Sequence, residues 1–233
     1  MFTRPPAPPI RLACVDMAGT VMSDDGVVMD AFRYALEAVG LPEANFDDAM
    51  EYARETMGLS KAVVFKGVLA DDELVRQAVA AFDSSIEQSI KQGRVDEIPG
   101  ARAAMQGLRE AGVKVCLTTG FTHEVQRAVI EHLGWADVTD FFMAPAGAIR
   151  GRPYPDMVLS AALRATVDDV REVAVVGDTA NDLWSGYRAG ASVIAGVLTG
   201  SHDRADLEKA PHTHILGSIA DFPAVVLDVA GTT

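Results

Sequence analysis

The chain of 233 residues has few of the features that mark secreted, membrane or nucleic-acid-binding proteins. It contains only two cysteines, so a disulfide framework is excluded, and a cytoplasmic chain would keep both thiols reduced as small core residues. No apolar run approaches the ~18 residues of a transmembrane helix. Basic residues are in the minority, and a net charge of −13 argues against binding nucleic acid or anionic membranes.

The composition is otherwise that of an ordinary globular enzyme, with 49% hydrophobic and 23% charged residues. The first nine residues lack the apolar segment of a secretory signal, so we expect a cytoplasmic location. An acidic protein that binds phosphate must create positive potential locally, from a metal ion and a few placed cations. Clustered carboxylates and isolated basic residues are therefore the candidate site residues.

Short apolar runs alternate with helical patterns along most of the chain. Strands are expected at about 10–16, 113–118, 140–143, 173–177, 192–197 and 213–216. Helices are expected between them, at about 100–111, 122–133, 155–165 and 180–189. This alternation predicts an α/β fold with a right-handed parallel sheet that helices cover on both faces.

One region breaks the alternation. From about Asp24 to Ile98 the pattern is helix after helix, with Asp71 as a plausible N-cap. The expected helices are 29–39, 45–57, 60–70 and 72–91. A helical insertion therefore separates the first strand from the second.

A carboxylate, Asp16, ends the first expected strand and is followed by a turn at Gly19-Thr20. Open α/β sheets bind ligands at the carboxyl ends of their strands. A carboxylate there can be a metal ligand, a nucleophile or both. The alternative is an aspartate that only caps the turn.

Three later segments add the other groups that phosphoryl transfer needs. The second strand ends at Thr118 and Thr119, Arg152 is an isolated cation in a proline-containing loop, and Asp178 and Asp182 follow the fourth strand. Together with Asp16 they supply hydroxyl groups that can donate hydrogen bonds to phosphate, a cation, and ligands for Mg²⁺, which prefers hard oxygen atoms. The two later aspartates could instead complement a helix dipole.

These segments, in this order, resemble the haloacid dehalogenase superfamily over nearly the whole chain. Asp-Met-Ala-Gly-Thr at 16–20, Thr-Thr-Gly at 118–120 and Gly-Arg-Pro at 151–153 are most similar to phosphonatase and its relatives. The resemblance implies a Rossmann-like parallel core at 1–22 and 99–233, and a helical cap domain at 23–98 that closes over the site. It also makes a homodimer plausible.

The resemblance assigns roles to particular residues. Asp16 would be the nucleophile that forms an aspartyl-phosphate, while Arg152 would neutralise charge from a position often held by lysine. Thr118 would donate its hydroxyl to the phosphate, with Thr119 as the competing candidate. The implied Mg²⁺ ligands are Asp16, the backbone carbonyl of Ala18, Asp178 and, through water, Asp182. The implied substrate-binding residues are Thr119, Gly120, Met57 and Phe121, where phosphonatase has Tyr in place of Phe121.

The role of Lys61 distinguishes Schiff-base chemistry from simple attraction of an anionic substrate. It ends the run Met-Gly-Leu-Ser-Lys at 57–61, which is similar to a phosphonatase cap motif whose lysine forms a Schiff base with an aldehyde. Its position at a helix start would favour the neutral amine that imine formation needs. The family motif continues with Asp and His where this chain has Val63 and Val64. The alternative is a surface lysine that only attracts an anionic substrate.

The residue two positions after Asp16 bears on the reaction type. Most phosphatases of the superfamily carry a second aspartate there to protonate the alkoxide, and this chain has Ala18. Its loss matters less when the leaving group is a stabilised enamine. We therefore predict hydrolysis of the C–P bond of a small phosphonate such as phosphonoacetaldehyde. The alternatives are a phosphomonoesterase acting on a small phosphate ester and a non-catalytic sensor of a phosphorylated metabolite.

Overall fold

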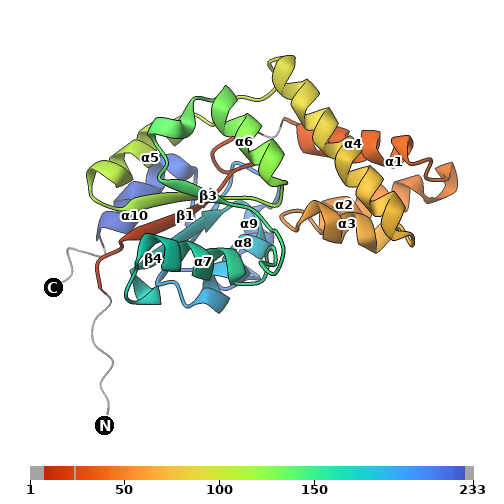
Figure 1. The fold of residues 1–233 in the computed structure, drawn as a ribbon. Helices are drawn as coiled ribbons and strands as arrows, with labels where there is room; N and C mark the ends of the chain where they lie inside the picture. Colours follow the sequence, from red (N-terminus) through yellow and green to blue (C-terminus); the bar gives the residue numbers. More distant parts are fainter. Residues whose placement is uncertain (1–7, 24, 229–233) are drawn as a thin grey trace, which may run out of the picture.

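A six-stranded parallel sheet forms the centre of the protein (Figure 1). The structure, a computed structural model, describes residues 8–23 and 25–228, so the ends of the predicted core, 1–7 and 229–233, lie outside the described residues. The strands are β1 Leu12–Asp16, β2 Lys114–Thr118, β3 Phe141–Met143, β4 Val173–Gly177, β5 Val193–Val197 and β6 His214–Leu216. Their order across the sheet is β3-β2-β1-β4-β5-β6. The predicted α/β class with a Rossmann-like sheet is confirmed.

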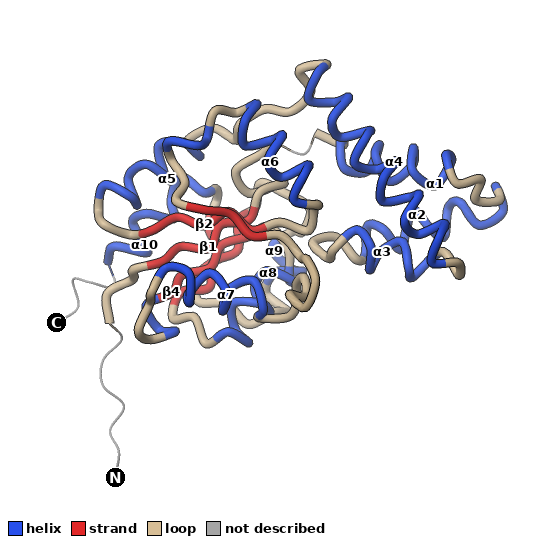
Figure 2. Tube along the Cα trace, in the orientation of Figure 1, coloured by secondary structure: helices blue, strands red, loops and turns tan. Residues whose placement is uncertain are grey.

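Helices cover both faces of this sheet (Figure 2). Side chains of α5 (Ala101–Glu110), α6 (His123–His132) and α10 (Phe222–Asp228) pack on the face to which β1 contributes Ala13 and Val15. The opposite face, with Leu12 and Cys14, packs against α7 (Asp156–Ala165) and α8 (Ala180–Ala189), while α9 (Arg204–Leu207) lies beside α8. Burial on both faces explains why the strands are continuous apolar runs.

Both cysteines lie in the middle of the sheet. Cys14 of β1 is the register partner of Cys116 of β2, and both are buried and free. Their predicted role as small core residues is confirmed.

Four helices form the insertion between β1 and β2, and they project to one side of the sheet (Figure 1). They are α1 Val27–Ala38, α2 Phe46–Glu55, α3 Lys61–Val68 and α4 Asp72–Lys91. Phe32, Phe65 and Phe82 are buried inside this body, with ring centroids 4.9 to 6.2 Å apart. Burial of three aromatic rings gives the insertion an apolar centre, which is continuous with the apolar core on one face of the sheet.

Local signals in the sequence set several helix ends. The Asp71 side chain accepts hydrogen bonds from the backbone N–H groups of Glu73 and Leu74, so it caps α4 as expected. Gly112 and Gly190 follow α5 and α8 in the left-handed conformation, each with φ of 82°. The short 3₁₀ helices were not predicted; they are Glu43–Asn45, Trp135–Asp137, Val170–Glu172 and Ile219–Asp221.

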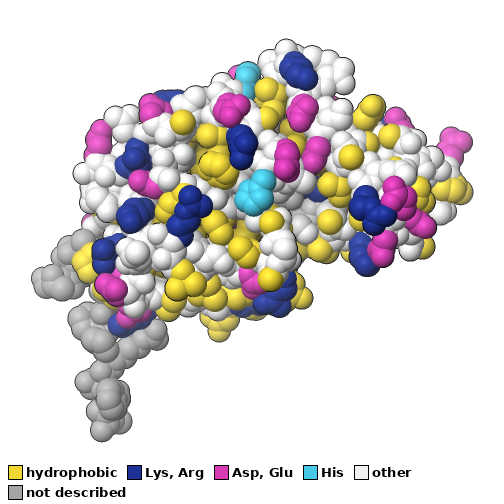
Figure 3. Space-filling model, in the orientation of Figure 1, with side chains coloured by type: hydrophobic (Ala, Val, Ile, Leu, Met, Phe, Trp, Pro, Cys, Tyr) yellow, Lys and Arg dark blue, Asp and Glu magenta, His cyan; other side chains and the backbone are white. Residues whose placement is uncertain are grey.

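The surface carries charges of both signs. On the face shown in Figure 3, Lys and Arg side chains are interspersed with Asp and Glu, and no broad basic region is visible. No helix in the described part of the chain combines the length and apolarity that a membrane span requires.

Candidate active site

The turn after β1 brings Asp16 to the carboxyl edge of the sheet. Met17 O accepts hydrogen bonds from three later backbone N–H groups, and Gly19 adopts φ of +77° within this turn. A Cβ atom on Gly19 would lie 2.5 Å from Oδ2 of Asp178, so only glycine fits there. Thr20 Oγ1 donates to Oδ2 of Asp16 at 3.3 Å. The Gly-Thr pair therefore lets the loops after β1 and β4 approach each other.

Asp178 and Asp182 follow the neighbouring strand β4. Asp178 Oδ2 accepts a 2.6 Å hydrogen bond from the backbone N–H of Ser201, which belongs to the loop after β5. Asp182 lies in the first turn of α8, where its Oδ2 accepts from the hydroxyl and the backbone N–H of Thr179. Because β1 and β4 are adjacent parallel strands, their carboxyl ends place these carboxylates beside Asp16.

Arg152 links two of these carboxylates. Its Nη1 atom donates to Oδ1 of Asp16 at 2.5 Å and to Oδ1 of Asp182. The side chain is buried, and its Nε atom is buried without a hydrogen-bond acceptor among the described residues. Both oxygens of Asp182 are thus engaged by protein groups, whereas Arg152 keeps one donor for another acceptor.

The cluster concentrates negative charge in a buried space. One ligand atom each from Asp16, Asp178 and Asp182 lies within 4.8 Å of the others. Burial raises the pKa of Asp16 to about 6, although the Arg152 guanidinium opposes this. Burial and the two neighbouring carboxylates raise the pKa of Asp178 well above its ordinary value. A buried acidic cluster of this kind could hold a metal ion.

The helical insertion closes the other side of the site. Asn181 Nδ2 donates to Met57 O at 2.8 Å, and the backbone N–H of Lys61 donates to Gly120 O at 3.3 Å. Added Cβ atoms on Gly58 and Gly120 would lie 2.5 Å from Thr179 Oγ1 and 2.4 Å from Leu59 O. The segment from Met57 to Lys61 is therefore docked closely against the loops of the core.

Lys61 is buried, with 6% of its surface exposed. Its Nζ atom lies 4.9 Å from the ring centroid of Phe32 and 5.3 Å from those of Phe82 and Phe121. These distances are those of cation–π contacts. The lysine is thus held in an aromatic environment at the insertion–core boundary. This burial does not agree with the alternative of a surface lysine.

A narrow pocket with a cavity volume of about 20 Å³ joins the two sides. Nine of the predicted site residues line it: Asp16, Ala18, Met57, Lys61, Thr119, Gly120, Phe121, Arg152 and Asp178. Thr118 and Asp182 are buried nearby but are not among its lining residues. Val28, Gly58, Thr179 and Ser201 also line the pocket and were not predicted. Gly58 belongs to the Met-Gly-Leu-Ser-Lys motif at 57–61, whereas Ser201 contributes a backbone N–H that leaves no signal in the sequence.

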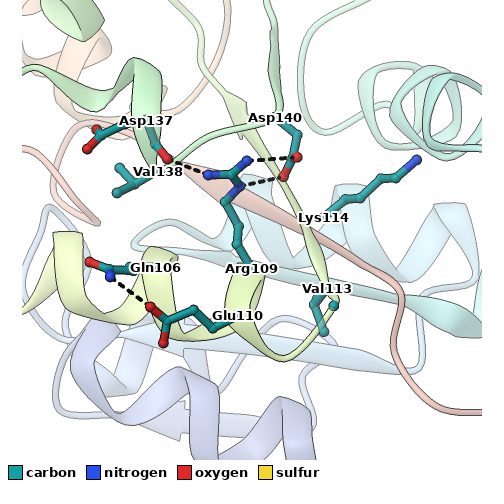
Figure 4. Close-up of a pocket in the computed structure, with 9 residues that line it drawn as sticks. Gln106, Arg109, Glu110, Val113, Lys114, Asp137, Val138 and Asp140 are labelled. Carbon is teal, nitrogen blue, oxygen red and sulfur yellow. Dashed lines mark hydrogen bonds and ion pairs between the residues drawn. The ribbon is translucent and has the colours of Figure 1, made fainter.

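A second groove lies at the amino ends of β2 and β3 (Figure 4). Arg109 donates there to the Asp140 carboxylate and to the backbone carbonyl of Asp137, and Gln106 donates to Glu110. These polar side chains are hydrogen-bonded to one another, so the groove has, among the residues that the structure describes, no cluster of carboxylates comparable to that of Asp16, Asp178 and Asp182.

Comparison with known proteins agrees with this arrangement. A sequence model of the haloacid dehalogenase-like hydrolases matches residues 10–190, so the chain belongs to that family and is a hydrolase by family. A phosphonoacetaldehyde hydrolase from Vibrio vulnificus (strain YJ016) is 25% identical, with 95% of each chain covered. A protein from Dickeya dadantii (strain 3937) named "Probable phosphatase IndB" is 28% identical, with 90% of each covered.

The fold is also similar to solved structures. A phosphonoacetaldehyde hydrolase-like protein from Oleispira antarctica superposes with a TM-score of 0.79 at 22% identity, covering 98% of this chain and 96% of the other. The recognition of a phosphonatase-like member of the haloacid dehalogenase family is thus confirmed, while the substrate is a separate question.

Proposed function

We propose that the protein is a Mg²⁺-dependent, phosphonatase-like hydrolase that cleaves the C–P bond of a small aldehyde-bearing phosphonate such as phosphonoacetaldehyde. One observation carries this proposal: the buried Lys61 and the strand-end carboxylate Asp16 line the same small pocket from opposite sides. An amine that can form an imine and a carboxylate that can attack phosphorus are the two groups that this reaction requires.

The residues at the carboxyl edge fit a magnesium ion. Asp16 and Asp178 would be direct ligands with the backbone carbonyl of Ala18, and Asp182, which Arg152 and Thr179 already engage, would act through water. Buried carboxylates whose pKa values are raised favour a nearby cation, and hard oxygen atoms suit Mg²⁺. When bound there, Mg²⁺ would neutralise charge on the phosphoryl oxygens.

The phosphoryl group would lie between Asp16 and the loop after β2. Thr119 and Gly120 line the pocket there, which favours Thr119 over Thr118 as the hydroxyl donor. The Nε donor of Arg152 is buried and has no acceptor among the described residues. A phosphonate oxygen would satisfy this donor, because guanidinium groups bind such oxygens strongly.

The reaction would follow from these positions. Lys61 Nζ, as a neutral amine, adds to the aldehyde carbon, and loss of water gives a protonated imine. A carboxylate oxygen of Asp16 then attacks phosphorus as the C–P bond breaks, and the bonding electron pair moves into the imine to give an enamine. The enamine takes a proton on carbon, and water releases acetaldehyde from Lys61 and phosphate from Asp16. No alkoxide forms, so an acid at position 18 is not needed.

The insertion would serve as a cap domain, with boundaries near residues 23 and 98. Its docked segment, Met57 to Lys61, supports this role because it packs directly against core loops that line the pocket. Formation of a homodimer, which only the resemblance implied, stays a prediction.

A phosphomonoesterase is the second candidate. One observation favours it: the phosphonatase motif has Asp and His at positions 63 and 64, and this chain has two valines there. Val63 is exposed and Val64 is buried, and neither can supply a carboxylate or an imidazole. The relative from Dickeya dadantii that is named a phosphatase is also about as similar as the named phosphonatases. Such an enzyme would need a good leaving group, because Ala18 cannot protonate one.

A phosphate-release screen with phosphonoacetaldehyde and a panel of small phosphate esters, each with and without Mg²⁺, tests the proposal. We expect Mg²⁺-dependent release from the phosphonate at a higher kcat/KM than from any ester. Borohydride added with the phosphonate should also attach a reduced two-carbon adduct to Lys61, which peptide mass spectrometry would locate. Faster release from an ester, with no adduct on Lys61, would contradict the proposal in favour of the phosphomonoesterase.

A further inference from the structure

Asp83, a carboxylate of the insertion, hydrogen-bonds to Thr122, and the residues that precede these two, Phe82 and Phe121, both contact Lys61. Asp83 follows Phe82 in α4, and the Phe82 ring contacts the Lys61 ammonium. Helix α4 packs against α3, which begins at Lys61, and against α6 of the core. Asp83 is therefore at the junction where the insertion, the core and the proposed imine-forming lysine meet.

The two oxygens of Asp83 have different environments. Oδ2 accepts a 2.8 Å hydrogen bond from Thr122 Oγ1, the N-cap of α6, so it joins the insertion to the core. Oδ1 is buried and accepts no hydrogen bond within the described chain. A buried acceptor without a partner costs free energy, and such groups in native structures often mark a functional role.

The charges around Asp83 set its protonation. Burial raises the pKa of Asp83 to about 6, with Glu124 of α6 and Glu87 of α4 acting in the same direction. The Thr122 hydrogen bond and the Lys61 ammonium act in the opposite direction. Near neutral pH this carboxyl can therefore both accept and return a proton, which a carboxyl with an ordinary pKa does poorly.

We propose that Asp83 is the proton-transfer and positioning partner of Lys61, taking the place of the acid–base groups that Val63 and Val64 cannot supply. This inference rests on the proposed Schiff-base function. Oδ2 is fixed by Thr122, and Oδ1 exchanges protons with the lysine amine through one bridging water molecule.

Formation of the imine leaves the number of protons on Asp83 unchanged. The Asp83 carboxylate takes one proton from the Lys61 ammonium, and the neutral amine adds to the aldehyde carbon to form a carbinolamine. Asp83 then returns its proton to the departing oxygen as the C–O bond breaks. The ammonium and the carbonyl thus become a protonated imine and one water molecule, and Asp83 ends as the carboxylate with which it began.

The test separates imine formation from C–P cleavage by using the Asp16→Asn background, in which phosphorus is not attacked. Asp16→Asn and Asp16→Asn/Asp83→Asn proteins are mixed with phosphonoacetaldehyde, quenched with borohydride at intervals, and the Lys61 adduct is quantified. We expect the amide at position 83 to slow adduct formation by about 100-fold, a typical contribution of general acid–base catalysis. Asp83→Glu should recover part of the rate.

The pH profile distinguishes proton transfer from a structural effect. With Asp83 present, adduct formation should fall as the pH drops through about 6, because the carboxylate that accepts the proton is lost. Asp83→Asn should remove this inflection. Glu87→Gln, which removes the same charge from the same helix, should keep the inflection and stay within about two-fold of the parent rate.

The outcomes are distinguishable. An unchanged adduct rate and pH profile in the Asp83→Asn protein would overturn the role of Asp83 and leave the Schiff-base function intact. Absence of any Lys61 adduct in the Asp16→Asn protein, with Asp83 present, would overturn the Schiff-base function and this inference together.

Discussion

The two sides of the pocket consist of different kinds of side chain. The core side consists of strand-end carboxylates and one guanidinium, all buried and mutually hydrogen-bonded or close. The insertion side consists of one lysine among phenylalanine rings, and the Asp83 carboxylate follows one of these phenylalanines. The core side has the groups for phosphoryl transfer in general, and the insertion side has the group that would choose a carbonyl substrate. Changes on the core side should therefore affect every substrate, and changes on the insertion side should be selective.

The largest effect is expected for Asp16→Asn on the core side. An amide is a poor nucleophile, so phosphate release from every substrate should fall by a factor of about 10⁴ or more. The protein should remain folded, with an unchanged or higher Tm, because the change removes one of three clustered buried charges. Retention of a tenth of the wild-type rate would remove Asp16 from the chemistry.

Removal of metal should have a comparable effect on all substrates. Treatment with chelator should reduce turnover to background and Mg²⁺ should restore it, because the carboxylate cluster needs a cation to receive an anionic substrate. Asp178→Ala should weaken Mg²⁺ binding by at least about ten-fold in calorimetry, since it removes a direct anionic ligand. Full activity after chelation and gel filtration would show that the carboxylate cluster works without metal.

A matched pair of glycines tests whether close docking of the insertion on the core is needed for activity. Gly58 and Gly40 both have positive φ, but only Gly58 meets the core, where a Cβ would lie 2.5 Å from Thr179 Oγ1. Both alanine variants should lose about 1–2 kcal/mol of stability from backbone strain. Gly58→Ala should also lose about ten-fold in kcat/KM, whereas Gly40→Ala should not. Equal activity of the two variants in a steady-state assay would argue against closure at this point.

A smaller effect is expected when one hydrogen bond across the boundary is removed. Asn181→Ala deletes the 2.8 Å bond to Met57 O, and such bonds contribute about 1 kcal/mol, or roughly five-fold in kcat/KM. Tyr187→Phe, an exposed position on the same helix, serves as the control. If Asn181→Ala matches that control, the bond does not hold the insertion in its active position.

The two sides also differ in how well the sequence predicted them. All six strands and the four insertion helices were expected, because apolar runs and helical periods are strong signals in short windows. Asp16 and Asp178 could be found because strand ends in parallel sheets converge at one edge. The short helices α9 and α10 were missed, since four to seven residues give too little periodicity.

Residues that depend on tertiary packing gave no signal. Asp83 lies within a helix rich in charged residues, where a carboxylate usually faces solvent, and only the packing of α4 on α3 and α6 gives it a buried oxygen. The phenylalanines around Lys61 come from three separate segments, so their convergence could not be read from spacing. The general chemistry was therefore predictable, and the environment of the lysine was not.

The most direct test of the central claim compares Lys61→Arg with Lys66→Arg, an exposed lysine on the same helix. A guanidinium keeps the positive charge but cannot form an imine at neutral pH. Lys61→Arg should lose at least about 10³-fold in phosphate release from phosphonoacetaldehyde, while Lys66→Arg stays within about two-fold of wild type. Full activity of Lys61→Arg on the phosphonate would contradict the claim that the insertion side chooses the substrate through this amine.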